Sequence, residues 1–385
     1  MPAITQFEVF ATDLPFRVRF KHAAHSRESS SSLFLKCTLD DGSVGWGEAL
    51  PRPYVTGETR DGAGELLARG ILPQLVGRSF AGFGELQGFL ETCDGQAPAR
   101  WVSPEVPQGA AWCAVDLALL DAFGRSFGCG PFPGEPDRFP EGFRYSGVLT
   151  SGRGAKRALQ LLAYRLAGFR ALKLKVDSGT DESDLRAIRR LAGRGIDLRA
   201  DTNMDWSVDE ALARMPVAEK YGVRSFEQPL VADDLAGAAR LVAETGLDVM
   251  ADESFTTRRS LERIIERKAF TAVNARISKC GGLVATLRRC REAVAAGLWV
   301  QVGAQVGESS VLSAAHLHLC HAFGAMRHAE GCFGTLLLRE DPAEPRVQMA
   351  LGGAPPALPE GPGLGAVVNE ERLAPWVSRH WRAPA

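Results

Sequence analysis

The sequence lacks several features that would assign it to a broad class at once. Its 385 residues include eight cysteines but no C-x-x-C pair, so neither a zinc knuckle nor a disulfide framework is expected. No apolar stretch approaches the roughly 18–20 residues that a membrane helix needs. The N-terminus has no basic segment followed by a continuous apolar core, as a secretory signal would have. These absences favour a cytoplasmic protein with free thiols.

An excess of charge of one sign is also missing. The formal net charge is -1, and acidic and basic residues are spread along the chain without a basic block or an acidic tail. Binding along a nucleic-acid backbone is therefore not expected. Apolar residues make up 45% and charged residues 24% of the chain, as in soluble globular proteins. A chain of this length is too long for one ordinary core, which predicts two domains.

The first third of the chain is patterned as a mixed α+β domain. Gln6–Ala11 and Leu33–Leu39 carry the β-branched and aromatic residues of strands. The polar stretch 22–32 lies between them and is predicted to be a loop. Residues 60–128 are mostly helical in pattern, and the breaker-rich segment 130–136 marks a boundary.

A second pattern begins near residue 143. Eight short apolar runs alternate with helical segments rich in Ala, Leu and Arg, which predicts a (β/α)8 barrel of the TIM type. The expected strands are Arg144–Leu149, Ala171–Val176, Asp197–Asp201, Val223–Glu227, Asp248–Asp252, Ala272–Ile277, Trp299–Gln305 and Met326–Glu330. A doubly wound open sheet is the competing fold, but the glycine-rich phosphate turn that it would place after its first strand is absent. We predict an α+β domain over 1–130, a barrel over 131–345 and a C-terminal segment over 346–385 that packs back on the first domain.

Three carboxylates follow one another at the ends of predicted strands. Asp201, Glu227 and Asp252 are separated by 26 and 25 residues, one strand–helix unit each, so they lie at the same height in the barrel. Each alone could be a surface acid or a helix N-cap, but three in phase would repel one another strongly unless a cation lay among them. Oxygen ligands of this kind favour Mg²⁺, with Mn²⁺ as the alternative. The spacing therefore predicts a metal site at the end of the barrel where such folds carry out chemistry.

Lys173 and Lys175 are two residues apart on a predicted strand, so both side chains point to one face. The alternate residues Leu172, Leu174 and Val176 are apolar and must face the helices, which leaves the barrel interior for the lysines. A lysine beside a second ammonium group and a divalent cation has a lowered pKa, as a base working near neutrality requires. Metal and lysine together predict removal of a carbon-bound proton next to a substrate carboxylate.

With these motifs the chain resembles the enolase superfamily, and within it the muconate-lactonizing and mandelate racemase-like branch. The motifs are Lys173-Leu-Lys175, Asp201-Thr-Asn203, Glu227-Gln-Pro229, Asp252-Glu-Ser254 and Arg276-Ile-Ser-Lys279-Cys-Gly-Gly282, with Gly307-Glu308-Ser309 in support. The resemblance covers essentially the whole chain. It implies that residues 1–130 form a capping domain whose loops at about 20–32 and 50–58 close the active site and set specificity.

The resemblance also implies roles for single residues. Asp201, Glu227 and Asp252 would bind Mg²⁺, Lys175 would be the acid–base group on one face of a small carboxylate substrate, and Lys173 would polarise that carboxylate. The reaction would pass through an enediolate and end in isomerisation, cycloisomerisation or elimination. Residues expected to support the ligands or touch the substrate are Asn203, Gln228, Glu308, Glu330, His25 and Tyr54.

The chain departs from the pattern of this branch at two places. Arg276 stands where the branch usually has the lysine of the opposite face, and arginine is a poor base because it stays protonated. Lys279 remains three residues further on, so either it takes that role or the enzyme uses one lysine in a lyase or cycloisomerase reaction. His328-Ala-Glu330 replaces the Asp-x-Asp of dipeptide epimerases, which argues against a dipeptide substrate.

Two functions of other classes stay open. Lys173 or Lys175 could be the nucleophile of a Schiff-base lyase, and Arg276 is compatible with a barrel that binds a metal or ligand without turnover. A metal-dependent hydrolase is disfavoured, because the first strand lacks the His-x-His that such barrels often have. No nucleic-acid or membrane partner is expected, and the resemblance implies a homo-oligomer.

Overall fold

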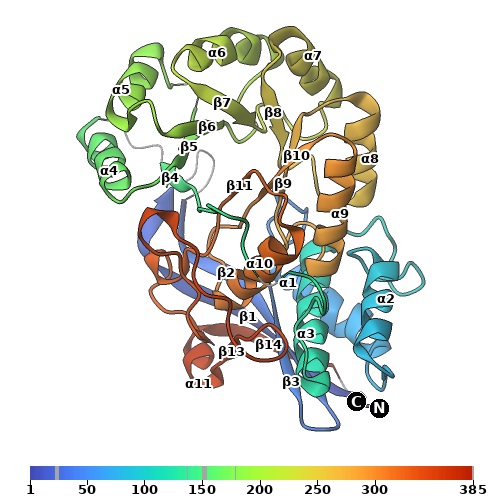
Figure 1. The fold of residues 1–385 in the computed structure, drawn as a ribbon. Coiled ribbons are helices and arrows are strands. Elements are labelled where there is room, and N and C mark those ends of the chain that lie inside the picture. The colour runs from blue at the N-terminus through green and yellow to red at the C-terminus, as the bar shows by residue number, and fades with distance from the viewer. Residues whose placement is uncertain (22–25, 137, 150–153, 178, 384–385) are drawn as a thin grey trace.

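The structure is a computed structural model, and it describes residues 1–21, 26–136, 138–149, 154–177 and 179–383. Its strands form a four-stranded sheet, an eight-stranded sheet and a two-stranded pair. Figure 1 shows the eight-stranded sheet and its helices in the upper part of the molecule and the N-terminal sheet in the lower part. The C-terminal segment, in red, lies beside the N-terminal sheet.

The eight-stranded sheet is parallel, in the order β11-β10-β9-β8-β7-β6-β5-β4, and closes into a barrel. Its strands are β4 (Gly147–Leu149), β5 (Ala171–Lys175), β6 (Asp197–Asp201), β7 (Val223–Glu227), β8 (Asp248–Ala251), β9 (Ala272–Ala275), β10 (Trp299–Val302) and β11 (His328–Ala329). A parallel bridge between Tyr145 and Ala329 closes the ring, and the N–H of Ser146 donates to the carbonyl of Ala329 at 2.9 Å. The predicted (β/α)8 barrel is confirmed.

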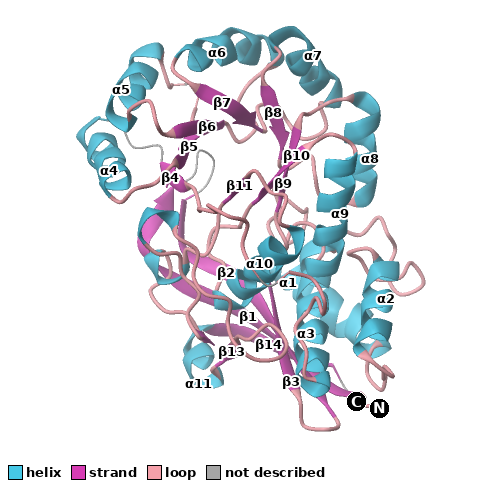
Figure 2. Ribbon diagram, viewed as in Figure 1, coloured by secondary structure: helices cyan, strands magenta, loops and turns pink. Residues whose placement is uncertain are grey.

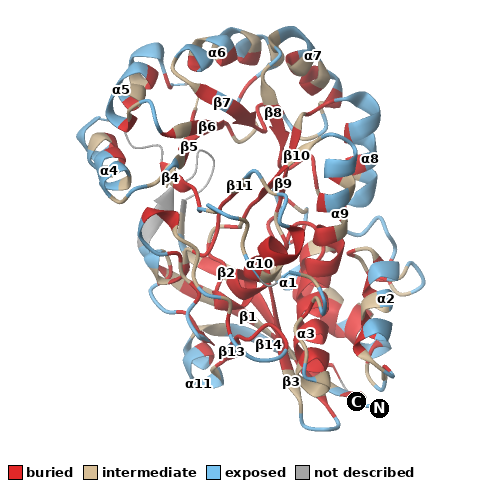
Figure 3. Ribbon diagram, in the orientation of Figure 1, coloured by how far each residue is buried: buried red, intermediate tan, exposed pale blue. Residues whose placement is uncertain are grey.

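Helices alternate with these strands around the barrel (Figure 2). They are α4 (Gly154–Leu166), α5 (Glu182–Ala192), α6 (Val208–Lys220), α7 (Leu235–Thr245), α8 (Arg258–Arg267), α9 (Leu283–Ala295) and α10 (Ser310–Phe323). Asp181, Ser207 and Thr257 each precede a helix and accept a hydrogen bond from the N–H three residues on, which fixes where α5, α6 and α8 begin. Figure 3 shows buried strands inside and exposed outer faces on α4 to α8. No helix in the described part of the chain is both long and apolar enough to cross a bilayer.

The N-terminal domain is an antiparallel sheet packed against helices. Its sheet has the order β14-β1-β2-β3, and its elements are β1 (Ile4–Lys21), β2 (Ser26–Leu39), β3 (Val44–Ala49), α1 (Arg60–Leu66), the turns Leu67–Ile71 and Leu72–Gln74, α2 (Phe83–Cys93) and α3 (Gly109–Phe127). The helix α3 is buried along most of its length (Figure 3) because it lies directly on β3. A Cβ at Gly47 would stand 2.0 Å from the carbonyl oxygen of Ala114, so only glycine fits there.

The polar stretch at 22–32 is not a loop throughout, as the sequence predicted. Residues 26–32 belong to β2, and β1 continues to Lys21, so the two strands form one long hairpin. Asp13 pairs with Ser31 and Leu14 with Ser30 across this hairpin, and the Ser31 hydroxyl donates to the Asp13 carboxylate at 2.7 Å. Pairing with β1 therefore imposes strand structure on serines that have little strand preference of their own.

The C-terminal segment completes the N-terminal sheet, as predicted. It contains the turn Gly334–Leu336, β12 (Ala343–Glu344), the turn Leu351–Gly353, β13 (Val367–Val368), α11 (Glu370–Leu373), the turn Ala374–Trp376 and β14 (Val377–Ala383). The strand β14 pairs antiparallel with β1 from Phe7 opposite Ala383 to Thr12 opposite Val377. The first and last strands of the described chain are thus neighbours.

Buried carboxylates of the N-terminal domain cap barrel helices. Glu48 at the end of β3 accepts hydrogen bonds from the N–H of Ser309 at 3.1 Å, its hydroxyl at 2.6 Å and the N–H of Leu312 at 3.2 Å. Asp116 of α3 accepts from the N–H of Leu283, the first residue of α9, at 2.6 Å. Both contacts satisfy N–H groups that a helix leaves unpaired at its start, and they fix the N-terminal domain over the C-terminal end of the barrel.

Candidate active site

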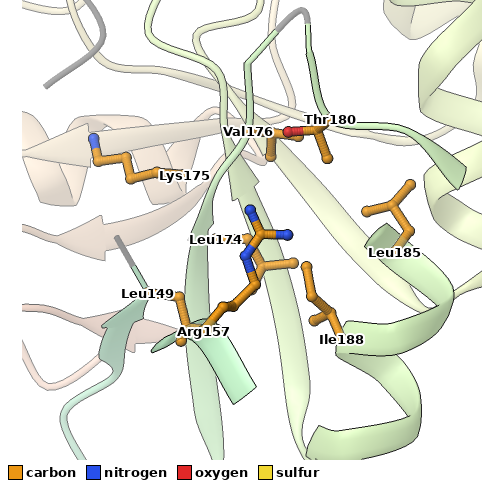
Figure 4. A pocket seen from close by; sticks show the side chains of 8 residues that line it. All are labelled: Leu149, Arg157, Leu174, Lys175, Val176, Thr180, Leu185 and Ile188. Carbon is orange, nitrogen blue, oxygen red and sulfur yellow. The ribbon is translucent and has the colours of Figure 1, made fainter. Parts of the chain in front are cut away.

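The two lysines lie on the inner face of β5. Lys175 is the register partner of Asp201 on β6 and stands at the C-terminal end of its strand. Figure 4 shows the Lys175 side chain extending away from Leu174 and Leu185, which line a gap between β5 and α5. Lys173, two residues earlier, shares the face of Lys175 and is more deeply buried, with 9% of its side chain exposed against 20%.

Asp201 and Glu227 end the adjacent strands β6 and β7 and are register partners. Only 2% and 3% of their surfaces are exposed. The ammonium group of Lys175 donates to Asp201 Oδ2 at 2.6 Å. Lys173 Nζ lies 3.2 Å from Glu227 Oε1 and 3.4 Å from Asp201 Oδ2. The lysines therefore act as the counter-charges of the first two carboxylates.

Asp252 follows β8 and has two cations of its own. The guanidinium of Arg276 donates to Asp252 Oδ2, and Lys279 Nζ donates to Oδ1 at 2.7 Å. Lys279 also donates to the backbone carbonyls of Asp252 at 2.6 Å and Asn274 at 2.8 Å. Its side chain is 0% exposed, whereas that of Arg276 is 12% exposed. Lys279 has three N–H donors and uses all of them in these three contacts. Because Arg276 is the more exposed of the two cations, it is the one nearer the mouth of the barrel.

Burial and charge act in opposite directions on Asp201. Burial alone would raise the pKa of Asp201, but Lys175 and Lys173 outweigh it, and the pKa is lowered. Burial raises the pKa of Glu227 to about 7, with Lys173 opposing the rise and Asp201 and Asp252 adding to it. The negative charges of Asp201 and Asp252 thus raise the pKa of Glu227, which lies on the strand between them.

The same balance holds around Arg276. Burial would raise the pKa of Asp252, but Arg276 and Lys279 hold it below its usual range. Burial and the charge of Asp252 raise the pKa of Glu253 to about 8, although Arg276 opposes this. Burial would lower the pKa of Arg276, but Asp252 and Glu253 outweigh it, so the guanidinium stays charged.

Glu330, which follows β11, connects Lys173 to a further buried cation. Its carboxylate lies 2.5 Å from Lys173 Nζ and 3.0 Å from a guanidinium nitrogen of Arg199 on β6. Burial would lower the pKa of Lys173, but the three carboxylates around it outweigh burial and raise that pKa. Lys173 is therefore an ammonium group held in place from several sides.

Three buried polar residues of this network were missed by sequence reasoning. Arg199 binds Glu330, while Asn274 and Gln301 donate to Glu227 at 2.9 and 3.2 Å. Arg199 stands two residues before Asp201 on its strand, and Asn274 two before Arg276. Since side chains two apart share a strand face, that periodicity was the signal that could have found Arg199 and Asn274.

Of the other predicted residues, two support the carboxylates. Asn203 Oδ1 accepts from Lys175 at 2.8 Å, and its N–H donates to Asp201 Oδ1 at 3.1 Å. Gln228 Oε1 accepts from the backbone N–H of Asp252 at 2.9 Å, which ties the end of β7 to the end of β8.

The remaining predicted residues are Glu308, Tyr54 and His25. Glu308 is 8% exposed in the turn after β10, and its pKa is affected by Arg276. Tyr54 lies between Ala49 and Arg60, outside helices and strands, with the guanidinium carbon of Arg27 at 5.4 Å from its ring centre. His25 lies outside the described residues.

The carboxylate oxygens fit a hard divalent cation by their chemistry. As the side chains lie, the described residues contain no group of three or more His, Cys, Asp or Glu side chains gathered for a metal ion. Asp201 is held by Lys175, and Asp252 by Arg276 and Lys279. A cation at these carboxylates would compete with the cationic side chains for the same oxygens. The carboxylate oxygens are therefore suitable ligands for a divalent cation. In this structure their negative charge is balanced by Lys175, Arg276 and Lys279.

Comparisons with known proteins agree with this arrangement. A family model described as "Enolase C-terminal domain-like" matches residues 156–372. The chain is 27% identical over 373 residues to the N-succinyl-L-Arg/Lys racemase of Bacillus cereus, covering 96% of both chains. It is 28% identical to muconate cycloisomerase 1 of Rhodococcus opacus, over 97% of this chain and 98% of that one. The crystal structure of the Bacillus cereus racemase matches with a TM-score of 0.87 at 26% identity, covering 99% of both chains.

Proposed function

Because the chain belongs to the enolase superfamily, in its muconate-lactonizing and mandelate racemase-like branch, we propose that it removes the proton next to the carboxylate of a small substrate in a Mg²⁺-dependent reaction. It is an isomerase-type enzyme, like these relatives. Lys175 is the base, and an enediolate is the species that forms when the proton leaves.

The position of Lys175 carries this proposal. Its side chain is the more exposed of the two lysines on β5, at 20%, and stands at the end of the barrel where this fold places its chemistry. Asp201 and Asn203 hold its ammonium group at 2.6 and 2.8 Å. A base held by two partners is oriented before substrate arrives, which lowers the entropic cost of proton transfer.

The other residues divide the remaining tasks. Lys173 stays charged and binds the substrate carboxylate, and Arg276 adds a second fixed positive charge near the mouth of the barrel. A divalent cation held by Asp201, Glu227 and Asp252 would supply the charge that stabilises the enediolate. Neither Lys173 nor Arg276 is a base in this arrangement.

A Schiff-base reaction fits the same residues less well. The nucleophile of such a reaction must be a neutral amine. The carboxylates around Lys173 raise its pKa, and Lys175 donates hydrogen bonds to Asp201 and Asn203. Lys173 is therefore held as an ammonium group and does not fit the role of nucleophile. Lys175 lies beside Asp201, one of three carboxylates for which a Schiff-base reaction has no use.

Exchange in D₂O tests the proposed reaction. We expect wild-type protein with Mg²⁺ to incorporate deuterium next to the carboxylate of N-succinyl amino acids, the class named for one of the relatives, as measured by proton NMR and mass spectrometry. Lys175→Ala should abolish the exchange of the enantiomer whose proton Lys175 removes, whereas Lys220→Ala at the exposed end of α6 should leave it unchanged. Equal exchange in the wild type and Lys175→Ala would show that Lys175 is not the base.

Metal binding has a separate readout in thermal unfolding. A ligand that binds only the folded state stabilises it by about 2.7 kcal/mol at a hundredfold excess over Kd. Mg²⁺ should therefore raise the unfolding midpoint of the wild type, and Asp201→Asn should lose this shift. Asp209→Asn, whose carboxylate is 91% exposed on α6, is the matched control. An equal shift in both variants would place the metal elsewhere.

A further inference from the structure

The face of the substrate opposite Lys175 has no lysine available as a base. Arg276 occupies the end of β9 but stays charged beside Asp252. Lys279 is fully buried and uses its N–H groups on Asp252 and Asn274. An isomerase that inverts a carbon centre needs a second group that gives or takes a proton there, and a residue at a neighbouring strand end must supply it.

Glu308 lies beyond the next strand of the barrel. It is in the turn between β10 and α10, and β10 pairs directly with β9, which precedes Arg276. Around the closed sheet, β10 is separated from β5 by β6 to β9 on one side and by β11 and β4 on the other. Glu308 therefore approaches the mouth of the barrel from a different side than Lys175.

The turn that carries Glu308 is held rigidly. The N–H of Gln305 donates to Glu308 Oε1 at 2.7 Å, and the next residue, Ser309, is bound by Glu48 of the N-terminal domain. Gly307 has a φ of +97°, and a Cβ there would lie 2.3 Å from the hydroxyl of Ser30. The turn is thus packed between the barrel and β2, which fixes the backbone from which the carboxyl group projects.

Glu308 is a buried carboxyl group in the field of two arginines. It is 8% exposed, and Arg276 of the barrel and Arg52 of the N-terminal domain both act on its charge. Burial raises its pKa to about 8, although the N–H of Gln305 and the two arginines oppose the rise. Further titratable groups that interact with it are Glu48, Cys113 and Cys332. A carboxyl group with such a pKa exchanges protons near neutrality, as a general acid–base group must.

We propose that Glu308 is the acid–base group on the face of the substrate opposite Lys175, an assignment that rests on the proposed function. In one direction, the proton on the α-carbon moves to Lys175, and the carboxyl proton of Glu308 is delivered to the opposite face of that carbon. In the other direction, the Glu308 carboxylate takes the proton and Lys175 returns one. Each turnover moves one proton off the carbon and one onto it, and exchange with water resets both groups.

Exchange resolved by enantiomer tests this assignment. Both enantiomers of an N-succinyl amino acid or another substrate that exchanges are incubated in D₂O with Mg²⁺, and α-deuterium is measured separately in each. We expect the wild type to exchange both enantiomers. Lys175→Ala should lose exchange of one, and Glu308→Gln should lose exchange of the other by about 10²- to 10⁴-fold, the usual contribution of a general acid–base group.

The controls separate a catalytic role from a structural one. Glu340→Gln, at an exposed position, should exchange both enantiomers as the wild type does. Glu308→Asp keeps a carboxyl group and should retain part of the exchange that Glu308→Gln loses. A thermal unfolding midpoint of Glu308→Gln that still rises with Mg²⁺ shows that the variant is folded.

The outcomes are distinguishable from a failure of the proposed function. Lys175-dependent exchange that Glu308→Gln leaves intact for both enantiomers overturns the role of Glu308 alone, as does wild-type exchange of a single enantiomer. Equal losses for both enantiomers in Glu308→Gln show a positioning role and likewise overturn the assignment. Absence of Mg²⁺-dependent exchange in the wild type overturns both proposals together.

Discussion

Arg276 and Lys279 are three residues apart and bind the same carboxylate, yet their surroundings differ. Lys279 has a fully buried side chain and lies 2.7 Å from Asp252 Oδ1, while Arg276 is 12% exposed at the mouth of the barrel. A buried cation whose partners are a carboxylate and two carbonyls contributes to stability mainly because its loss leaves those groups unpaired.

Replacing Lys279 should therefore affect folding more than it affects proton transfer. We expect Lys279→Met to lower the free energy of unfolding by about 3–5 kcal/mol, the range for breaking a buried ion pair. Urea denaturation followed by circular dichroism measures this, with Lys220→Met on the exposed end of α6 as a control expected within about 0.5 kcal/mol of the wild type. A loss below 1 kcal/mol for Lys279→Met would contradict this prediction.

At the level of residues, the regular spacing of the carboxylates and lysines along the sequence predicted where they lie in the barrel. The phase of Asp201, Glu227 and Asp252 placed them on neighbouring strand ends, and the two-residue period placed Lys173 and Lys175 on one face. The environments of Arg276 and Lys279 could not be predicted, because β9 ends at Ala275 and the direction of side chains in the following turn has no simple period.

Among the elements, α10 depends on a carboxylate from the other domain. Glu48 of β3 binds the N–H of Ser309 and of Leu312 at the start of α10, where the helix has unpaired donors. Burial raises the pKa of Glu48 to about 8, although its bonds to Ser309 oppose the rise. In the unfolded chain the same group titrates near 4.5.

This difference predicts how stability changes with pH. Because the folded pKa of Glu48 is above the unfolded one, its contribution is fully present below pH 4.5 and is lost as the pH rises through about 8. We expect the free energy of unfolding to fall between about pH 5 and pH 8, as followed by urea denaturation at each pH. Asp116, whose pKa burial raises to about 7, adds to the same slope.

Glu48→Gln cannot ionise, so the variant should lose its share of that slope while keeping the share of Asp116. Glu85→Gln, at an exposed position on α2, is the matched control and should keep the whole slope. Equal slopes in the Glu48 variant and the wild type would show that the titrating groups lie elsewhere.

The elements were predicted from sequence with unequal success, for physical reasons. Asp197–Asp201 and Val223–Glu227 are strands with the predicted bounds, because their apolar runs are short and end in polar residues. The first and last barrel strands along the chain, β4 and β11, are shorter than predicted, at three and two residues. The serines at 29–32 were assigned to a loop, since local preference does not reveal that β1 is long enough to pair with them.

In the whole molecule, β14 is the edge strand of the N-terminal sheet and covers one edge of β1. It pairs with β1 from Phe7 to Thr12, so its removal would expose a row of unpaired backbone groups on β1. One cluster of buried apolar residues includes members of both domains, such as Phe7 and Val273. We infer that the two domains support one another's folding.

Deleting residues from Val377 onward should therefore weaken the entire protein. We expect the wild type to unfold in one calorimetric transition and the truncated chain to unfold several degrees lower and to self-associate in size-exclusion chromatography. Leu351→Ser, at a site 83% exposed in the same segment, is the control and should behave as the wild type. A truncated chain that stays monomeric at an unchanged midpoint would contradict this prediction.

The barrel architecture could be predicted from the sequence, but the pairing of β1 with β14 in the N-terminal sheet could not. Alternating patterns over residues 144–330 predicted eight strands and hence the barrel, because such units recur at a regular length. Pairing of β1 with β14 depends on contacts between residues as distant as Phe7 and Ala383, which no local pattern records.

The pairing of β1 with β14 has a consequence for the order of events on the ribosome. The strand β1 is synthesised before the barrel, but its neighbour β14 leaves the exit tunnel only after the barrel has been translated. Until then one edge of β1 is open to pairing with another nascent chain. Newly made protein should therefore be most dependent on chaperones between translation of the barrel and translation of β14, while the N-terminal sheet still lacks that strand.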